Sequence, residues 1–182
     1  MRLRHRLGLM RWSAAPYRGA LVIVAGACAA TLALPASGLG AAAPNCRSSQ
    51  LRMRVVSFEG ATGRRFWQLA FRNLGATCSL QGFSRVVLLA RNGDPITAGF
   101  RRETGFPQST VTLERGKSAF VAFTYLDGGF CSAGNFYAFR VKISPPGAGG
   151  GFLLNPVPRN GGPIFLCAGS ERVYPVTSKP GP

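Results

Sequence analysis

Short runs in which apolar and polar residues alternate follow one another along the chain after residue 43. In Phe66–Asn73 the side chains of Trp67, Leu69 and Phe71 share one side, and polar or small residues share the other. A period of two residues is typical of a β-strand with one buried face, so Trp67 and Phe71 are predicted core residues. The same patterning predicts nine strands: Leu51–Phe58, Phe66–Asn73, Arg85–Arg91, Ile96–Arg101, Thr110–Leu113, Ser118–Tyr125, Phe136–Ser144, Pro163–Cys167 and Arg172–Val176.

Glycine and proline separate these runs. Asn92-Gly93 predicts a hairpin, because both residues tolerate a positive φ. Ser144-Pro145-Pro146 ends a strand and opens a Gly/Pro-rich loop over residues 145–163. No amphipathic helix of useful length is evident after residue 43. Many short strands joined by such turns predict an all-β fold, an antiparallel β-sandwich formed by residues 44–182 as a single domain.

Residues 1–43 have a different pattern. Five arginines and no acidic residue precede an apolar run of 16 residues, Gly19–Leu34, which small residues follow up to Ala43. A basic start, an apolar centre and a small-residue exit predict a secretory signal peptide with a signal helix. Two alternatives stay open. The segment could remain as an uncleaved anchor, although the run is shorter than most spanning helices, or Cys28 could be a lipidation site.

The charge of the chain is strongly basic: 22 Lys and Arg against 6 Asp and Glu give a net charge of +16. Without residues 1–43 the balance is 17 basic against 6 acidic residues, or +11. Summed positive charge steers association with anionic partners. The outward positions of the predicted strands form a candidate basic binding face for anionic cell-wall polymers, anionic lipid or nucleic acid. Its residues are Arg52, Arg54, Arg72, Arg140 and Lys142. An envelope protein is a further candidate partner. The alternative is a solvated face that reflects only an arginine-rich composition.

Four cysteines remain after residue 43: Cys46, Cys78, Cys131 and Cys167. An even number in an exported chain predicts two disulfides, and the wide spacings exclude a Cys-x-x-Cys metal or redox motif. Three pairings are possible. If consecutive predicted strands alternate in direction, all four cysteines lie at one end of the domain. That topology favours Cys46–Cys167 and Cys78–Cys131.

The predicted domain lacks side chains that several common catalytic centres require. The one histidine, His5, lies in the predicted signal peptide, so the domain has none for a Ser-His-Asp or Cys-His centre or for a His-ligated metal site. The six acids are expected to be scattered over the surface rather than paired for hydrolysis. Gly116-Lys117-Ser118 lacks the earlier glycine of a phosphate-binding loop and joins two predicted strands. We expect no catalytic residues, no metal and no cofactor.

The order of cysteines and glycines resembles an actinobacterial exported family called domain of unknown function 4232. The resemblance rests on Asn73-Leu74-Gly75-Ala76-Thr77-Cys78-Ser79-Leu80-Gln81-Gly82-Phe83, on Leu113-Glu114-Arg115-Gly116-Lys117-Ser118-Ala119, and on the flanking cysteines, from Cys46 to about Val176. The resemblance implies an immunoglobulin-like sandwich that is exported or lipid-anchored. It implies no established activity and therefore supplies no catalytic residue.

Charge, cysteines and the missing catalytic groups together predict a non-enzymatic binding domain on the extracellular side of the cell. It would be secreted or associated with the envelope and would contact a partner through its basic face or its loops. The alternative is a membrane-tethered accessory lipoprotein anchored through Cys28. Nucleic acid is disfavoured as a partner, because the chain is predicted to be exported and has no recognition helix.

Overall fold

The computed structural model describes residues 42–96, 100–132, 134–155 and 162–181, which belong to one compact unit spanning Gly40–Pro182. The predicted signal helix and Cys28 lie outside the described residues. The domain is built from strands and two short 3₁₀ turns, η1 (Ser48–Gln50) and η2 (Gly128–Phe130). The strands are β1 (Leu51–Ala61), β2 (Arg64–Asn73), β3 (Cys78–Leu80), β4 (Arg85–Leu89), β5 (Arg101–Arg102), β6 (Val111–Leu113), β7 (Ser118–Leu126), β8 (Asn135–Ala138), β9 (Arg140–Ser144), β10 (Phe152–Leu154), β11 (Ile164–Cys167) and β12 (Arg172–Val173).

The first layer is a five-stranded sheet in the order β1-β2-β7-β12-β5. β1 and β2 form its longest hairpin, which turns at Thr62 and Gly63 with φ of 48° and 77°. Two successive positive φ values are typical of a type I′ turn, whose twist matches that of the strands. The neighbouring strands of this sheet are antiparallel except at one edge, where β5 runs parallel to β12.

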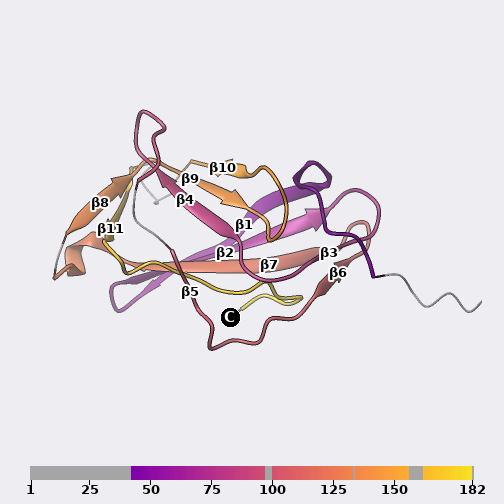
Figure 1. Cartoon of the computed structure of the whole chain (residues 1–182). Coiled ribbons are helices and arrows are strands. Elements are labelled where there is room, and N and C mark those ends of the chain that lie inside the picture. The colour runs from indigo at the N-terminus through magenta and orange to yellow at the C-terminus, as the bar shows by residue number, and fades with distance from the viewer. Residues whose placement is uncertain (1–41, 97–99, 133, 156–161, 182) are drawn as a thin grey trace, which may run out of the picture. The chain divides into compact units, whose positions relative to one another are not determined.

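The second layer lies across the first (Figure 1). It contains the sheet β10-β9-β4 and the two-stranded ladder β11-β8. β8 and β9 are one extended run interrupted at Phe139, whose N–H still donates to the carbonyl of Leu89 on β4. Two short strands that the sequence pattern did not predict also form. β3 pairs with β6, and β10 pairs with β9 inside the predicted Gly/Pro-rich loop.

The strand order is that of an immunoglobulin-like sandwich. In that arrangement strands A, B, E and D share one sheet, and strands C, F and G share the other. Here β1, β2, β7 and β5 take the places of A, B, E and D, and β12 is inserted between the last two. β4 corresponds to strand C, the β8–β9 run to strand F, and β10 and β11 to strand G. The predicted all-β sandwich is therefore confirmed.

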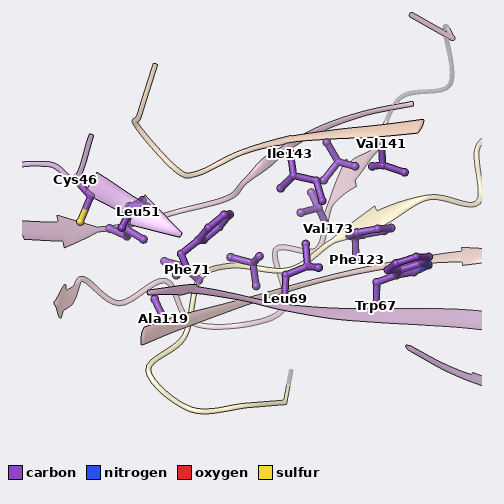
Figure 2. Packing of buried hydrophobic residues seen from close by; sticks show 14 of the residues in the cluster. Cys46, Leu51, Trp67, Leu69, Phe71, Ala119, Phe123, Val141, Ile143 and Val173 are labelled. Atoms are coloured by element: carbon purple, nitrogen blue, oxygen red, sulfur yellow. The ribbon is translucent and has the colours of Figure 1, made fainter. Parts of the chain in front are cut away.

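The core lies between the two layers, and the predicted inward residues of β2 and β9 fill it, although Gln68 and Ala70 on the other side of β2 are buried as well. Trp67, Leu69 and Phe71 of β2 are at most 1% exposed, and Val141 and Ile143 of β9 are fully buried. Figure 2 shows these two groups of side chains between the layers. The ring of Trp67 stacks on that of Phe123, with 5.6 Å between centroids. Burial of large apolar side chains at this density, about 1.5–3 kcal/mol each, dominates the stability of the sandwich.

The four predicted cysteines form two disulfides, but the predicted pairing is wrong. The bonds are Cys46–Cys78, with 4.9 Å between Cα atoms, and Cys131–Cys167, with 5.1 Å. The prediction took Ser118–Tyr125 to run in the same direction as Phe66–Asn73. In the structure β7 lies beside β2 and runs antiparallel to it.

This reversal of direction places the two disulfides at opposite ends of the sandwich. Cys78 follows the end of β2 that meets the start of β7, whereas Cys131 follows the end of β7. The paired part of β2 and β7 is nine residues long, and a strand rises about 3.3 Å per residue. Cys78 and Cys131 are therefore too far apart to bond, and each bonds instead to the cysteine at its own end.

Candidate functional site

The five residues of the predicted basic face do not lie on one face. On β1 and β2, Met53 and Phe71 pack in or against the core. Arg52 and Arg72 alternate with these two residues and are exposed, and they lie directly opposite each other in the β1–β2 ladder. This trio of Arg52, Arg54 and Arg72 belongs to the outer face of the five-stranded sheet. Arg140 and Lys142 alternate with the buried β9 residues and so belong to the outer face of the other layer. The two groups face away from each other.

The outer face of the β4–β9 layer gathers additional cations. Register places Val87 opposite Lys142 and Leu89 opposite Arg140, so Arg85 is diagonal to Lys142 on the same face. Arg140 Nη2 donates to the carbonyl of Arg91 at 3.1 Å, and the Arg91 guanidinium lies 4.6 Å from the centre of the Phe139 ring. We call this set the cationic face. Its residues are Arg85, Arg91, Arg140 and Lys142.

A groove of about 600 Å³ runs over part of the cationic face. Val87 and Leu89 of β4 contribute apolar surface to it, Arg85 and Lys142 contribute charge, and the glycine-rich segment 147–150 forms one border. The described part of the chain contains two ion pairs, Arg65–Asp127 and Arg172–Glu103. Neither of them uses a residue of the cationic face, so these charges remain available to an external anion.

Arg85 and Arg91 were absent from the predicted face, although the sequence carries a signal for both. The run Val86–Ala90 is apolar at every position, which hides its alternation. In the structure Val86 and Leu88 are buried, and Arg85, Val87 and Leu89 share the opposite side. Counting by two from Arg85 would have placed Arg91 on this side as well.

One acid lies in the interior, contrary to the expectation of scattered surface acids. Glu171 is fully buried, and neither of its carboxylate oxygens has a hydrogen-bond partner among the described residues. Burial raises the pKa of Glu171. The nearby N–H groups of Glu171 and Gly169, which do not reach hydrogen-bond geometry, and the charges of Arg172 and Arg101 counteract this only in part. The burial has a simple cause, since Glu171 immediately precedes β12, alternates with the outward Arg172 and therefore points inward.

Among the residues that the structure describes there is neither a cluster of metal ligands nor a membrane-spanning helix. No cluster of three His, Cys, Asp or Glu side chains there could hold a metal ion. No helix there is long and apolar enough to cross a membrane. All four cysteines of the domain are in disulfides, which are typical of proteins in oxidising compartments.

The asparagine of the predicted family motif has a structural role. Asn73 is fully buried and its amide group is fully hydrogen-bonded. Nδ2 donates to the carbonyls of Ala76 and Leu113 at 2.8 Å, and Oδ1 accepts from the N–H of Gly75 at 2.9 Å and from Gln50 Nε2 at 3.3 Å. These bonds tie the end of β2 to the turn before Cys78, to the end of β6 and to η1. Asn73 therefore has a structural role at this end of the sandwich.

Fold, disulfides and family motif together define a class of protein, a disulfide-braced all-β domain with an immunoglobulin-like strand order. The chain belongs to the family described as Domain of unknown function (DUF4232), whose model matches residues 46–177. No curated protein and no solved structure matches the chain. The matched range extends from the first disulfide cysteine to Thr177, which bridges to Phe120 of β7, and so covers the sandwich. The predicted family is confirmed, and the family itself assigns no activity.

Proposed function

We propose that the protein is exported and acts without catalysis, by binding an anionic polymer of the cell surface through the cationic face. The observation that carries this proposal is the position of Arg85, Arg91, Arg140 and Lys142 on one outer face, with no carboxylate paired to any of them in the described part of the chain. Excess positive charge of this kind steers association and gives it a strong dependence on salt.

The spacing of the cations suits a chain of repeated negative groups. Arg140 and Lys142 are two residues apart on one strand, which separates them by about 6.5–7 Å. Arg85 is on the neighbouring strand, diagonal to Lys142 and about 7–8 Å away. A polymer with a phosphate or carboxylate in each repeating unit can meet several of these charges together. The groove beside Val87 and Leu89 offers apolar surface to the backbone of such a polymer.

The test compares charge reversal on the two outer faces. The variant Arg85→Glu/Lys142→Glu changes the cationic face, and the control Arg52→Glu/Arg72→Glu changes net charge by the same amount on the opposite sheet. Retention on isolated cell walls, and affinity for sodium polyphosphate and for polygalacturonate, are measured at increasing salt. We expect the first variant to lose at least tenfold in affinity and the control to lose about threefold or less, because nearby charges dominate at physiological salt.

Two results would overturn this assignment. If both double variants lose affinity equally, the net charge of the domain explains the binding and the cationic face has no special part. If the wild-type protein washes off walls at low salt, no functional cationic face exists.

Export is part of the proposal and has its own measurement. The intact mass of protein from the medium and from membranes of a bacterial host is determined before and after reduction. We expect a secreted form that begins near Pro44 and has four cysteines alkylated only after reduction. A membrane form that begins at an acylated Cys28 would instead establish the lipid-anchored alternative.

A further inference from the structure

A second hollow, of about 470 Å³, opens between the layers at the β8–β11 end of the sandwich. On the side of the five-stranded sheet, the hollow is lined by three residues that lie side by side on neighbouring strands: Gly60 on β1, Arg65 on β2 and Tyr125 on β7. Pro163, Ile164 and Phe165, at the start of β11, line it from the other layer. The hollow is thus bounded by regular strands of both sheets, which hold its side chains in place.

Two glycines, Gly60 and Gly128, leave space for the side chains of Arg65 and Phe165 that line this hollow. A side chain at Gly60 would overlap the Arg65 guanidinium, and a side chain at Gly128 would overlap the Phe165 ring. Gly60 does not have a positive φ, so a turn does not require glycine there. The absence of its side chain lets the guanidinium lie along the strand at the border of the hollow.

The polar groups of the hollow are only partly used within the protein. Arg65 Nε and Nη2 both contact Asp127 Oδ2 at 2.8 Å, and the Nη1 group has no hydrogen-bond partner among the described residues. Tyr125 is 4% exposed, and its hydroxyl oxygen accepts a bond from Trp67 Nε1 at 3.4 Å. Tyr125 lines the hollow, and its O–H has no acceptor among the described residues. Burial raises the pKa of this phenol and keeps it protonated.

The apolar part of the hollow comes from rings. Phe58 lines it and lies 4.7 Å from the centre of the Trp67 ring, so it is held by the core. Phe165 lines it on the opposite side and stacks on Tyr137, with 4.6 Å between centroids and 54% of Tyr137 exposed. Firmly held rings with exposed neighbours are typical of binding surfaces rather than of a closed core.

From these contacts we propose that the hollow binds one or two rings of an uncharged saccharide. The charges of Arg65 and Asp127 cancel, so the hollow has no net attraction for an anion or a cation. An Arg–Asp pair and a phenol offer donors and an acceptor side by side, as neighbouring sugar hydroxyls require, and Phe58 and Phe165 face the C–H surface of a ring. The volume lies in the lower part of the range of ligand pockets, which suits so small a ligand.

The experiment measures binding of named sugars to the isotope-labelled protein isolated from an exporting host. D-glucose, D-galactose, D-mannose and N-acetyl-D-glucosamine are each titrated to about 50 mM, because a ligand of one ring is expected to bind weakly. Sodium acetate is the charged comparison. We expect at least one sugar to shift the amide signals of Gly60, Tyr125 and Phe165, with an affinity that does not change with salt.

Three variants test the assignment of the groups. Tyr125→Phe removes the hydroxyl, Arg65→Met removes the guanidinium, and Gly60→Ala displaces it without removing a polar group. Each is expected to weaken binding about tenfold, the usual loss for a polar partner of a bound ligand. Arg52→Met, on the outer face of the same sheet, is the matched control and is expected to bind as the wild type does. Thermal unfolding verifies that each variant is folded.

Failure of all four sugars to bind would overturn the proposal. It would also be overturned by binding that Tyr125→Phe and Arg65→Met leave unchanged, or by acetate binding in preference to the sugars. These outcomes are separate from those of the polymer experiment. Arg85 and Lys142 do not line this hollow, so reversing their charges is not expected to change sugar binding. Added salt weakens the binding of an anionic ligand but not that of a neutral one.

Discussion

Each end of the sandwich is closed by a disulfide, but the ends differ in the hydrogen bonding of a buried polar side chain and in the exposure of aromatic rings. At the β3–β6 end, the Asn73 amide is fully bonded and Cys46 and Cys78 are both buried. At the β8–β11 end, Glu171 has no hydrogen-bond partner among the described residues, and Phe130 and Tyr137 are 65% and 54% exposed. Figure 1 shows the two ends on opposite sides of the domain.

This difference supports the proposal that the first end stabilises the fold and that the second end binds a ligand. A buried polar group that has all its bonds stabilises one conformation, whereas a group without partners costs stability and persists where something else uses it. The first end has the arrangement expected of a structural closure. The second combines an unpartnered acid, exposed rings and a hollow with free donors, which is the arrangement expected of a binding region.

The largest predicted effect comes from removing either disulfide. The variants Cys46→Ala/Cys78→Ala and Cys131→Ala/Cys167→Ala are each expected to lose about 3.5–4 kcal/mol, because the two loops have similar lengths of 32 and 36 residues. Urea unfolding measures both losses. Under mild reduction with alkylation, Cys131–Cys167 is expected to open first, since Cys131 is only partly buried. Earlier opening of Cys46–Cys78 would reverse the assigned roles of the two ends.

A smaller loss is expected for Asn73→Ala at the β3–β6 end. The substitution leaves the N–H of Gly75 and the carbonyl of Leu113 without their side-chain partner, and several such losses sum to about 3 kcal/mol. Chemical denaturation measures the change. Asn155→Ala, at an exposed position, is the control and is expected to change stability by less than about 0.5 kcal/mol. Equal effects of the two substitutions would refute the structural role of Asn73.

The smallest effect, and one of opposite sign, is expected for Glu171→Gln at the other end. Since burial raises the pKa of Glu171, the folded state holds a proton that the unfolded state releases above about pH 4.3. Its contribution to stability is thus greatest in acid, falls as pH rises toward the native pKa, and is constant above it. We expect Glu171→Gln to stabilise the protein by about 1–2 kcal/mol at pH 7 and to have little effect near pH 4.

The measurement is thermal unfolding of wild type and Glu171→Gln between pH 4 and pH 8. Glu114→Gln, which changes an exposed acid, provides the control. A loss of stability in Glu171→Gln at neutral pH would mean that the carboxylate is ionised and pairs with Arg101 or Arg172. In that case Glu171 would have polar partners, as Asn73 has, and the contrast between these two residues would disappear.

Much of the fold could be predicted from alternation alone. Trp67, Leu69 and Phe71 are core residues as predicted, and the main strands of both layers lie within a few residues of their predicted bounds. The strands β3 and β10 were missed, because three residues cannot display a period of two convincingly. β10 in addition lies among glycines and prolines, where pairing with β9 overrides the local preference.

The candidate sites were harder to predict. Alternation identified Arg140 and Lys142 as outward residues, but it could not distinguish which of two outer faces each strand contributes to. Arg65 is about 60 residues away from Tyr125 and Asp127 in the sequence and shares no motif with them, so their meeting depends on the pairing of β2 with β7.

The sequence by itself determined the family, the all-β class, the disulfide-forming cysteines and the residues that fill the core. These properties follow from composition and from local period, which each segment carries without reference to the others. The tertiary structure alone decided the disulfide partners, the division of the basic residues between two faces, the burial of Glu171 and the hollow beside Tyr125. All four depend on the direction in which β7 runs against β2 and on how the layers face each other, because strand pairing brings together residues that no local pattern connects.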